Sequence, residues 1–236
     1  MKRFCSILFF SIFFGGFIFA QEVTLQQMLD RSAAAYLKTI SEESVLYYGN
    51  VQETLPRTTN HSYLEDQQYV KARLSYLGVV YHEAELRLDL MRHELVVLSP
   101  LMRHVVLFPE NVDFAELHGR RVVFETGASH GSLSRGYYFL LHSGNCRVLE
   151  RQSASLNRKD NNANILEEYY IISTRFFLYK DGVYHTIRSK RGLLQVLEPH
   201  KKELKRFISA NHLSFRKHQG EFIVRSVVEY EKLSGL

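Results

Sequence analysis

The class of fold is decided by residues 69–89, YVKARLSYLGVVYHEAELRLD, in which the hydrophobic pattern has a period of two. Apolar side chains occupy alternate positions over residues 70–76 and again over residues 84–88, and Gly78 lies in a turn between the two runs. Such alternation is typical of a β-strand that buries one face. Two such runs around a turn predict an antiparallel hairpin with one apolar face and one charged face.

Short β-rich runs continue towards residue 187 and extend this hairpin into a meander. They fall at residues 93–98, 103–108, 112–117, 121–126, 137–142, 146–151, 169–179 and 183–187. The turns Ser143-Gly144-Asn145 and Lys180-Asp181-Gly182 are hairpin signals, because Gly, Asn and Asp tolerate the positive φ angles of tight turns. Residues 153–164 are polar and predict a loop.

Helical periodicity occurs near the two ends of the chain. The expected helices are residues 24–40, residues 189–197, a segment that starts at Pro199, and residues 221–233, where a strand is the alternative. The polar stretch 41–66 predicts a connection with at most a short strand at 45–48. The expected fold class is α+β, with an N-terminal helix, a long antiparallel β-meander (sheet or half-barrel) and C-terminal helices.

The first twenty residues have the layout of a secretory signal peptide. Lys2 and Arg3 precede an apolar run, and Ala20 is the small residue before the expected cleavage point. A retained membrane anchor is the alternative, although the run is shorter than the ~20 apolar residues that span a bilayer. We expect cleavage after Ala20 and export to the periplasm or the cell surface. The other expected divisions are an N-terminal helix and connection at 21–66, an antiparallel β region at 67–188 and a basic helical region at 189–236.

Cysteine usage limits how the exported chain is stabilised. Cys5 lies in the expected leader, so Cys146 stands alone and no internal disulfide is expected. A lipoprotein would carry a cysteine directly after the cleavage point, where this chain has Gln21. We therefore expect stability to come from packing, with Cys146 as a buried, inert thiol.

The charge is unevenly distributed along the chain. Residues 21–174 carry 15 Lys and Arg against 19 Asp and Glu, whereas residues 175–236 carry 13 against 6. This basic section predicts contact with an anionic lipid or polysaccharide. The alternative is that the lysines around residue 202 are the solvated face of a helix. Export argues against nucleic acid as a partner.

One catalytic pattern occurs literally, because residues 127–131, GASHG, match the G-x-S-x-G nucleophile elbow of α/β-hydrolases. In that fold a strained strand-to-helix turn exposes the serine, here Ser129. The residues that follow predict a strand instead of a helix, and the chain lacks a βαβ pattern. We interpret the segment as a hairpin loop. A serine hydrolase is kept as an alternative, with an acid and one of four histidines as partners: His142, His185, His200 or His212.

Histidine pairs suggest no metal centre. His82-Glu83 and His93-Glu94 each begin a zinc-helix pattern, but neither has a histidine four positions after the first. Both pairs also lie on expected strands, whose geometry differs from that of the zinc helix. No metal or other cofactor is expected.

Carboxylates on the first hairpin have two interpretations. Glu83, Glu85 and Asp89 share one strand face and resemble the paired acids of a glycosidase. A solvated, charged sheet face explains them more simply, with Lys71 and Arg73 forming ion pairs across the hairpin.

Three segments resemble a family of exported proteins that is common in Bacteroidetes. They are residues 85–97 (ELRLDLMRHELVV), 136–144 (GYYFLLHSG) and 177–194 (FLYKDGVYHTIRSKRGLL). The similarity extends over about residues 45–232, and Leu88 and Glu94 depart from the family's Tyr and Asp. The resemblance implies an envelope location and no established activity, and it assigns no site residues.

These observations leave three hypotheses for function. The favoured one is a non-catalytic cell-envelope protein that binds a partner protein or the membrane surface through its sheet face or its basic C-terminal helices. The second is a periplasmic carrier of a small apolar ligand, held by a half-barrel whose aromatic-rich strands at 137–141 and 169–179 line it. The third is a hydrolase that uses Ser129 or the strand-face acids.

Overall fold

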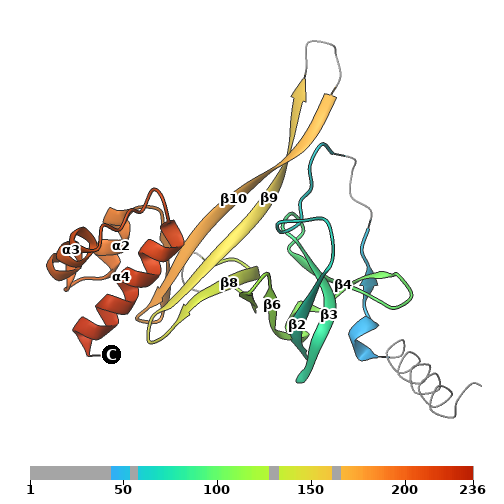
Figure 1. Cartoon of the computed structure of the whole chain (residues 1–236), viewed down its shortest axis with the longest axis horizontal. Coiled ribbons are helices and arrows are strands. Elements are labelled where there is room, and N and C mark those ends of the chain that lie inside the picture. Colours follow the sequence, from blue (N-terminus) through green and yellow to red (C-terminus); the bar gives the residue numbers. More distant parts are fainter. Residues whose placement is uncertain (1–43, 54–57, 128–132, 161–165, 236) are drawn as a thin grey trace, which may run out of the picture. The chain divides into compact units, whose positions relative to one another are not determined.

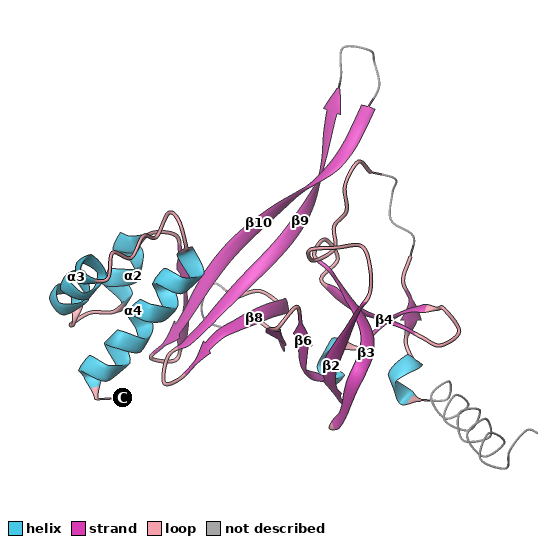
Figure 2. Ribbon diagram, viewed as in Figure 1, coloured by secondary structure: helices cyan, strands magenta, loops and turns pink. Residues whose placement is uncertain are grey.

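An antiparallel sheet of eleven strands forms most of the part of the chain that the structure describes (Figures 1 and 2). The structure is a computed structural model that describes residues 44–53, 58–127, 133–160 and 166–235. The expected signal peptide, the expected helix at 24–40 and Ser129 lie outside the described residues.

The strands follow the expected meander closely. They are β1 (Asn50–Val51), β2 (Val70–Tyr76), β3 (Val79–Asp89), β4 (Glu94–Leu98), β5 (His104–Val106), β6 (Val112–Leu117), β7 (Arg120–Glu125), β8 (Gly136–Ser143), β9 (Arg147–Asp160), β10 (Leu166–Lys180) and β11 (Val183–Ile187). Their order in the sheet is β1-β5-β4-β3-β2-β6-β7-β8-β9-β10-β11. The sheet is therefore open, with β1 and β11 at its edges, and β6 returns beside β2 to continue the meander in the other direction.

Two local predictions are wrong. Residues Val45–Tyr47 form a short 3-10 helix, η1, capped by the Ser44 hydroxyl, and the strand β1 follows it. The expected loop at 153–164 is largely strand, because β9 continues to Asp160 in register with β10. Figure 1 shows the two strands side by side as a long hairpin. Ile171 and Ile172 point to opposite faces of it, yet they are 47% and 46% exposed. Over residues 155–159 of β9 no side chain is fully buried, so the sequence lacks the alternation that marks a half-buried strand.

The alternating residues build a core that extends from β2 to β10. Leu74, Leu86, Leu95 and Ala115 are fully buried in it, and Phe139 of β8 joins the same cluster. A second cluster lies on the opposite side chains of β8 and its neighbours, where Tyr138 packs edge-on against Phe177 at 5.6 Å. Because both faces of the central strands are covered, side chains fill the region in which a half-barrel carrier would hold its ligand.

The C-terminal helices are present as expected, and residues 221–233 are helical. The helices are α2 (Lys190–Val196), α3 (Lys201–Ala210) and α4 (Gln219–Ser234). They share an apolar cluster with the ends of β8–β11, and Leu193, Leu204 and Ile223 lie at its centre. None of the described helices is long and apolar enough to cross a bilayer.

A buried carboxylate ties α4 to the β8–β9 turn. Glu231 accepts a hydrogen bond from the Cys146 backbone N–H at 2.7 Å, and its other oxygen lies 2.9 Å from His142 Nε2. A Cβ at Gly144 would lie 2.5 Å from Glu231 Oε1, so the close approach of this carboxylate requires a glycine in the turn. The burial of Cys146 raises the pKa of its thiol, and Glu231 adds to this effect.

The segment before β2 connects distant strands. Leu64 N donates to Leu88 O, and Leu90 N donates to Ser62 O, so residues 62–64 pair with the end of β3. The Asn60 amide donates to Tyr170 O at 2.8 Å and accepts from Tyr170 N at 2.6 Å. Residues 58–64, which we call the strap, therefore run from β10 to β3. They contact β10 at Tyr170, before the stretch of β10 that pairs with β11, where its outer edge is free of a strand partner among the described residues.

Glu231→Ala is expected to lower the free energy of unfolding by about 2 kcal/mol, because the buried Cys146 N–H and His142 lose their acceptor. The matched control is Glu229→Ala on the same helix. Among the described residues, Glu229 has one ion pair, a 3.9 Å contact with Lys232. We expect the control to cost less than about 0.5 kcal/mol. Urea denaturation measures both, and equal losses would show that Glu231 does not hold the helices to the sheet.

Candidate functional site

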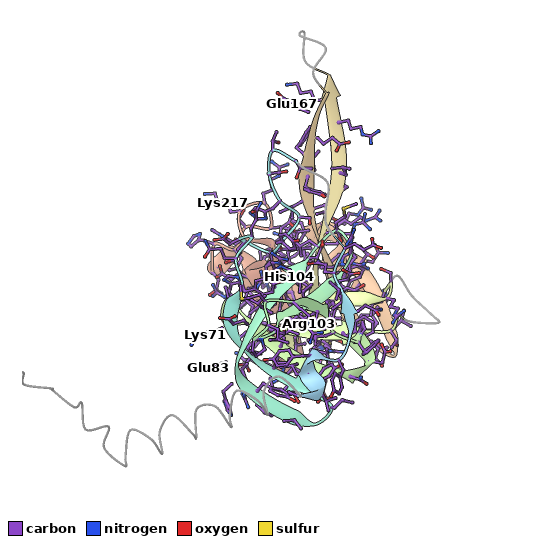
Figure 3. All side chains as sticks on the ribbon, turned by 90° about the vertical axis from the view of Figure 1, so that its right-hand side faces the viewer. Lys71, Glu83, Arg103, His104, Glu167 and Lys217 are labelled. Carbon is purple, nitrogen blue, oxygen red and sulfur yellow. The ribbon has the colours of Figure 1, made fainter. Side chains whose placement is uncertain are left out.

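The C-terminal helices carry a group of exposed cations that have no acidic partner among the described residues. These residues, which we call the basic surface, are Arg188, Lys190, Arg191, Lys202, Lys205, Arg206, Arg216 and Lys217. The Lys217 side chain projects outward from the helical part in Figure 3. Because the local charges are not neutralised, this surface attracts anions.

The helix α3 shows how the sequence builds this surface. Leu204 and Ile208 are buried against the neighbouring helices, so the opposite side of α3 places Lys202 and Lys205 in solvent. Lys201 differs from them, because its ammonium lies 3.1 Å from a Glu198 carboxylate oxygen. The prediction that the lysines around residue 202 lie on an exposed helix face is confirmed.

A groove of about 520 Å³ lies within the basic surface. Arg188, Lys190 and Arg216 line it, together with the half-buried side chains of Leu213 and Phe215. No carboxylate is among its lining residues. The groove thus combines three cations with an apolar base, which suits a ligand that has an anionic group and a hydrocarbon part.

Charges on the sheet are arranged differently, since several of them are paired. Arg120 donates to the buried Glu150 at 2.7 Å and lies over the Phe139 ring, 3.6 Å from its centre. Arg147 lies 2.7 Å from Glu125, and both side chains are largely buried. These ion pairs neutralise the sheet locally, so the basic surface is the better candidate for an electrostatic contact.

The carboxylates of the first hairpin divide into two environments. Glu83 and Glu85 are exposed, as expected, and Lys71 lies 3.1 Å from Glu83 on the outer surface in Figure 3. Arg73 does not pair across the hairpin, since it lies 3.5 Å from Glu116 of β6 instead. The reason is that β2 has β6 as its other neighbour.

Asp89 is not part of the solvated face. It is fully buried and accepts hydrogen bonds at Oδ1 from the Ser62 hydroxyl, Met91 N and Arg92 N, at 3.1, 2.8 and 3.2 Å. Gln52 donates to its other oxygen at 3.3 Å. The strap and the β3–β4 turn cover this end of β3, and the Asp89 carboxylate satisfies their donors.

The candidate catalytic and metal residues lie on separate elements. His142 is on β8, His185 on β11, and His200 and His212 flank α3; His82 is exposed on β3. Ser129 is outside the described residues, so its position relative to these histidines is not described. Within the described ranges, no three His, Cys, Asp or Glu residues are grouped as a metal site.

Comparisons with known proteins identify no relative. No protein-family model, curated protein or solved structure matches the chain. The resemblance of its three segments to exported Bacteroidetes proteins therefore stays a prediction.

Sequence reasoning missed the roles of Asp89 and Glu231. The signal for Asp89 is local, because an acidic residue that ends a strand often accepts the N–H groups of the following turn. Glu231 has no comparable signal, since its partners Cys146 and His142 are more than eighty residues away in the sequence.

His93, in the turn that Asp89 organises, is expected to make stability depend on pH. Burial and, to a smaller extent, nearby Arg151 lower its pKa to about 4, and Asp89 opposes the shift. The unfolded chain, with the ordinary value of 6.5, therefore binds this proton more readily. The free energy of unfolding should fall as the pH drops from about 6.5 to about 4, and this contribution should be constant above that range.

The variant His93→Asn tests this dependence, because asparagine tolerates the residue's φ of 56° but does not titrate. Urea midpoints measured from pH 4 to pH 7.5 should vary less in the variant than in the wild type. Neighbouring Glu94, whose pKa burial raises, contributes with the opposite sign and is present in both proteins. If the urea midpoints of the variant and the wild type changed with pH in parallel, the pH dependence could not be assigned to His93.

Proposed function

We propose that the protein is an exported, non-catalytic component of the cell envelope that acts by binding, and that its basic surface attaches it to an anionic membrane surface. The observation that carries this proposal is the set of exposed cations on the C-terminal helices that lack acidic partners among the described residues. Lipid headgroups with net negative charge attract such a surface with about 1 kcal/mol for each Lys or Arg close to it.

Export and family membership belong to the same proposal. The layout of residues 1–20 supports cleavage after Ala20, and the three resembling segments support an origin among exported Bacteroidetes proteins. A protein partner in the envelope is an alternative to the membrane, and the test below separates the two.

The other two hypotheses receive less support. An apolar carrier needs an empty sheet interior, whereas Leu74, Leu86 and Phe139 are packed into one cluster there. A hydrolase that uses the strand-face acids would need them free to act, and one of the three, Asp89, accepts hydrogen bonds from four donors.

Vesicle co-sedimentation tests membrane attachment. We expect the protein to bind vesicles that contain phosphatidylglycerol, to bind pure phosphatidylcholine vesicles weakly, and to dissociate at high salt. The triple variant Arg188→Gln, Lys190→Gln and Arg216→Gln should bind about a hundredfold more weakly, because three cations leave the surface.

The matched control removes three cations elsewhere, with Lys71→Gln, Arg103→Gln and Lys159→Gln. Lys71 and Arg103 are labelled in Figure 3, and all three side chains are exposed. The control should bind anionic vesicles nearly as well as the wild type. Equal weakening by both triple variants would indicate a general effect of net charge, and no binding to anionic vesicles would leave an envelope protein as the partner.

Processing is tested by replacing the small residue before the expected cleavage point. In its native host, the wild-type protein should be recovered from the envelope with Gln21 as its first residue, as read by mass spectrometry. Ala20→Arg should accumulate as the uncleaved chain, because the peptidase accepts small side chains at that position. Recovery of uncleaved wild-type chain from the cytosol would refute export.

A further inference from the structure

A cavity of about 360 Å³ lies beside the β3–β4 turn, away from the basic surface. One wall is polar and consists of Asn50 and residues 92–94, and Arg135 and Gly136 contribute from the start of β8. The apolar part of the lining consists of residues 106–109 and Phe124. This volume falls within the range of about 300–1,000 Å³ that is typical of sites for small molecules.

The apolar wall is incompletely covered. Phe108 is 40% exposed, and Phe124 packs edge-on against Tyr137 with the ring centres 5.2 Å apart. Two phenyl rings and Val106 thus offer apolar surface to anything that enters the cavity. A hydrocarbon or aromatic group would remove this surface from water.

The polar wall contains a carboxylate oxygen without a partner. Glu94 Oε2 is buried and accepts no hydrogen bond from the described residues. Burial raises the pKa of Glu94, and this effect outweighs that of Arg92, which lowers it. Asp89, across the ladder from Glu94, is saturated with donors, so the two acids differ. Gln52 acts on the Glu94 carboxylate, but Oε2 itself has no hydrogen-bond partner among the described residues. Since buried acceptors are normally satisfied, a ligand can supply a donor to this oxygen.

The cation Arg135 also lines this cavity. The Arg135 guanidinium lies 5.3 Å from the centre of the Phe124 ring and 3.7 Å from Glu110, and about two thirds of its side chain is exposed. This loose pair leaves Arg135 able to turn towards a ligand. Arg92 is held more firmly, because it donates to the Glu53 backbone oxygen at 2.9 Å and lies 3.4 Å from the Glu53 carboxylate.

The combination of Glu94 with two arginines makes this cavity unsuitable for a simple cation or anion. A lone ammonium would suit Glu94 but would meet two arginines, and a lone carboxylate would suit Arg135 but would meet Glu94. A ligand with both charges on one end and an apolar group on the other satisfies Glu94, Arg135 and the apolar part of the lining. Tyr137, next to Gly136 in the sequence, has a buried hydroxyl without a partner among the described residues.

We propose that this cavity binds a zwitterionic α-amino acid or short peptide with an apolar side chain. Its ammonium donates to Glu94, its carboxylate accepts from Arg135, and its side chain lies against Phe108 and Phe124. This site is independent of membrane attachment, so either proposal can fail alone.

Calorimetric titration of the purified protein with L-phenylalanine tests the proposal. We expect saturable binding of L-phenylalanine, and binding at least tenfold weaker for N-acetyl-phenylalanine, which lacks the ammonium, and for phenylalanine amide, which lacks the carboxylate. Absence of binding by L-phenylalanine and by L-leucine would overturn the proposal. Equal binding of phenylalanine and its two blocked forms would also overturn it.

Variants of Glu94 and Arg135 test which side chain binds the ammonium and which binds the carboxylate of the ligand. Glu94→Gln keeps the shape of the side chain and should weaken L-phenylalanine at least tenfold, and Arg135→Gln should weaken it several-fold. Glu116→Gln, an exposed acid on β6 that pairs with Arg73, is the matched control and should bind as the wild type does. Thermal unfolding of each variant without ligand confirms that it is folded. Unchanged affinity in folded Glu94→Gln would refute the site.

Discussion

The buried carboxylate of Asp89 is the interaction on which this end of the sheet depends. It gathers donors from the strap, from the backbone of the β3–β4 turn and from Gln52, which follows β1. A desolvated carboxylate is costly unless hydrogen bonds replace water, and here they come from segments that share no strand ladder with each other. The same turn fixes His93 and Glu94 at the wall of the cavity, so the geometry of the cavity follows from that of Asp89.

Much of the fold is predictable from period and turn chemistry. The alternation at 70–76 and 84–88 gave the hairpin β2–β3, and Asp181-Gly182 gave the turn between β10 and β11. The prediction failed where no side chain of a strand is fully buried, as in residues 155–159 of β9. Its support is the ladder with β10, which leaves no hydrophobic signature in the sequence.

The candidate sites were predictable in unequal measure. The basic surface follows from composition and from the helical spacing around Leu204 and Ile208, because one side of such a helix must face water. The cavity could not be predicted from the sequence, because Glu94, Phe124 and Arg135 come from β4, β7 and the residue before β8. In the chain, β5 and β6 lie between β4 and β7. Only the folded register shows that one oxygen of Glu94 has no hydrogen-bond partner among the described residues.

The strap has a consequence for the order in which the chain acquires its structure. Asn60 and Tyr170 are separated by 110 residues, so their two hydrogen bonds require β10 to be made and placed first. Closing so long a loop is slow compared with forming a hairpin. During synthesis, the outer edge of β10 is consequently uncovered until this late step, and nascent chains are then most prone to pair with one another.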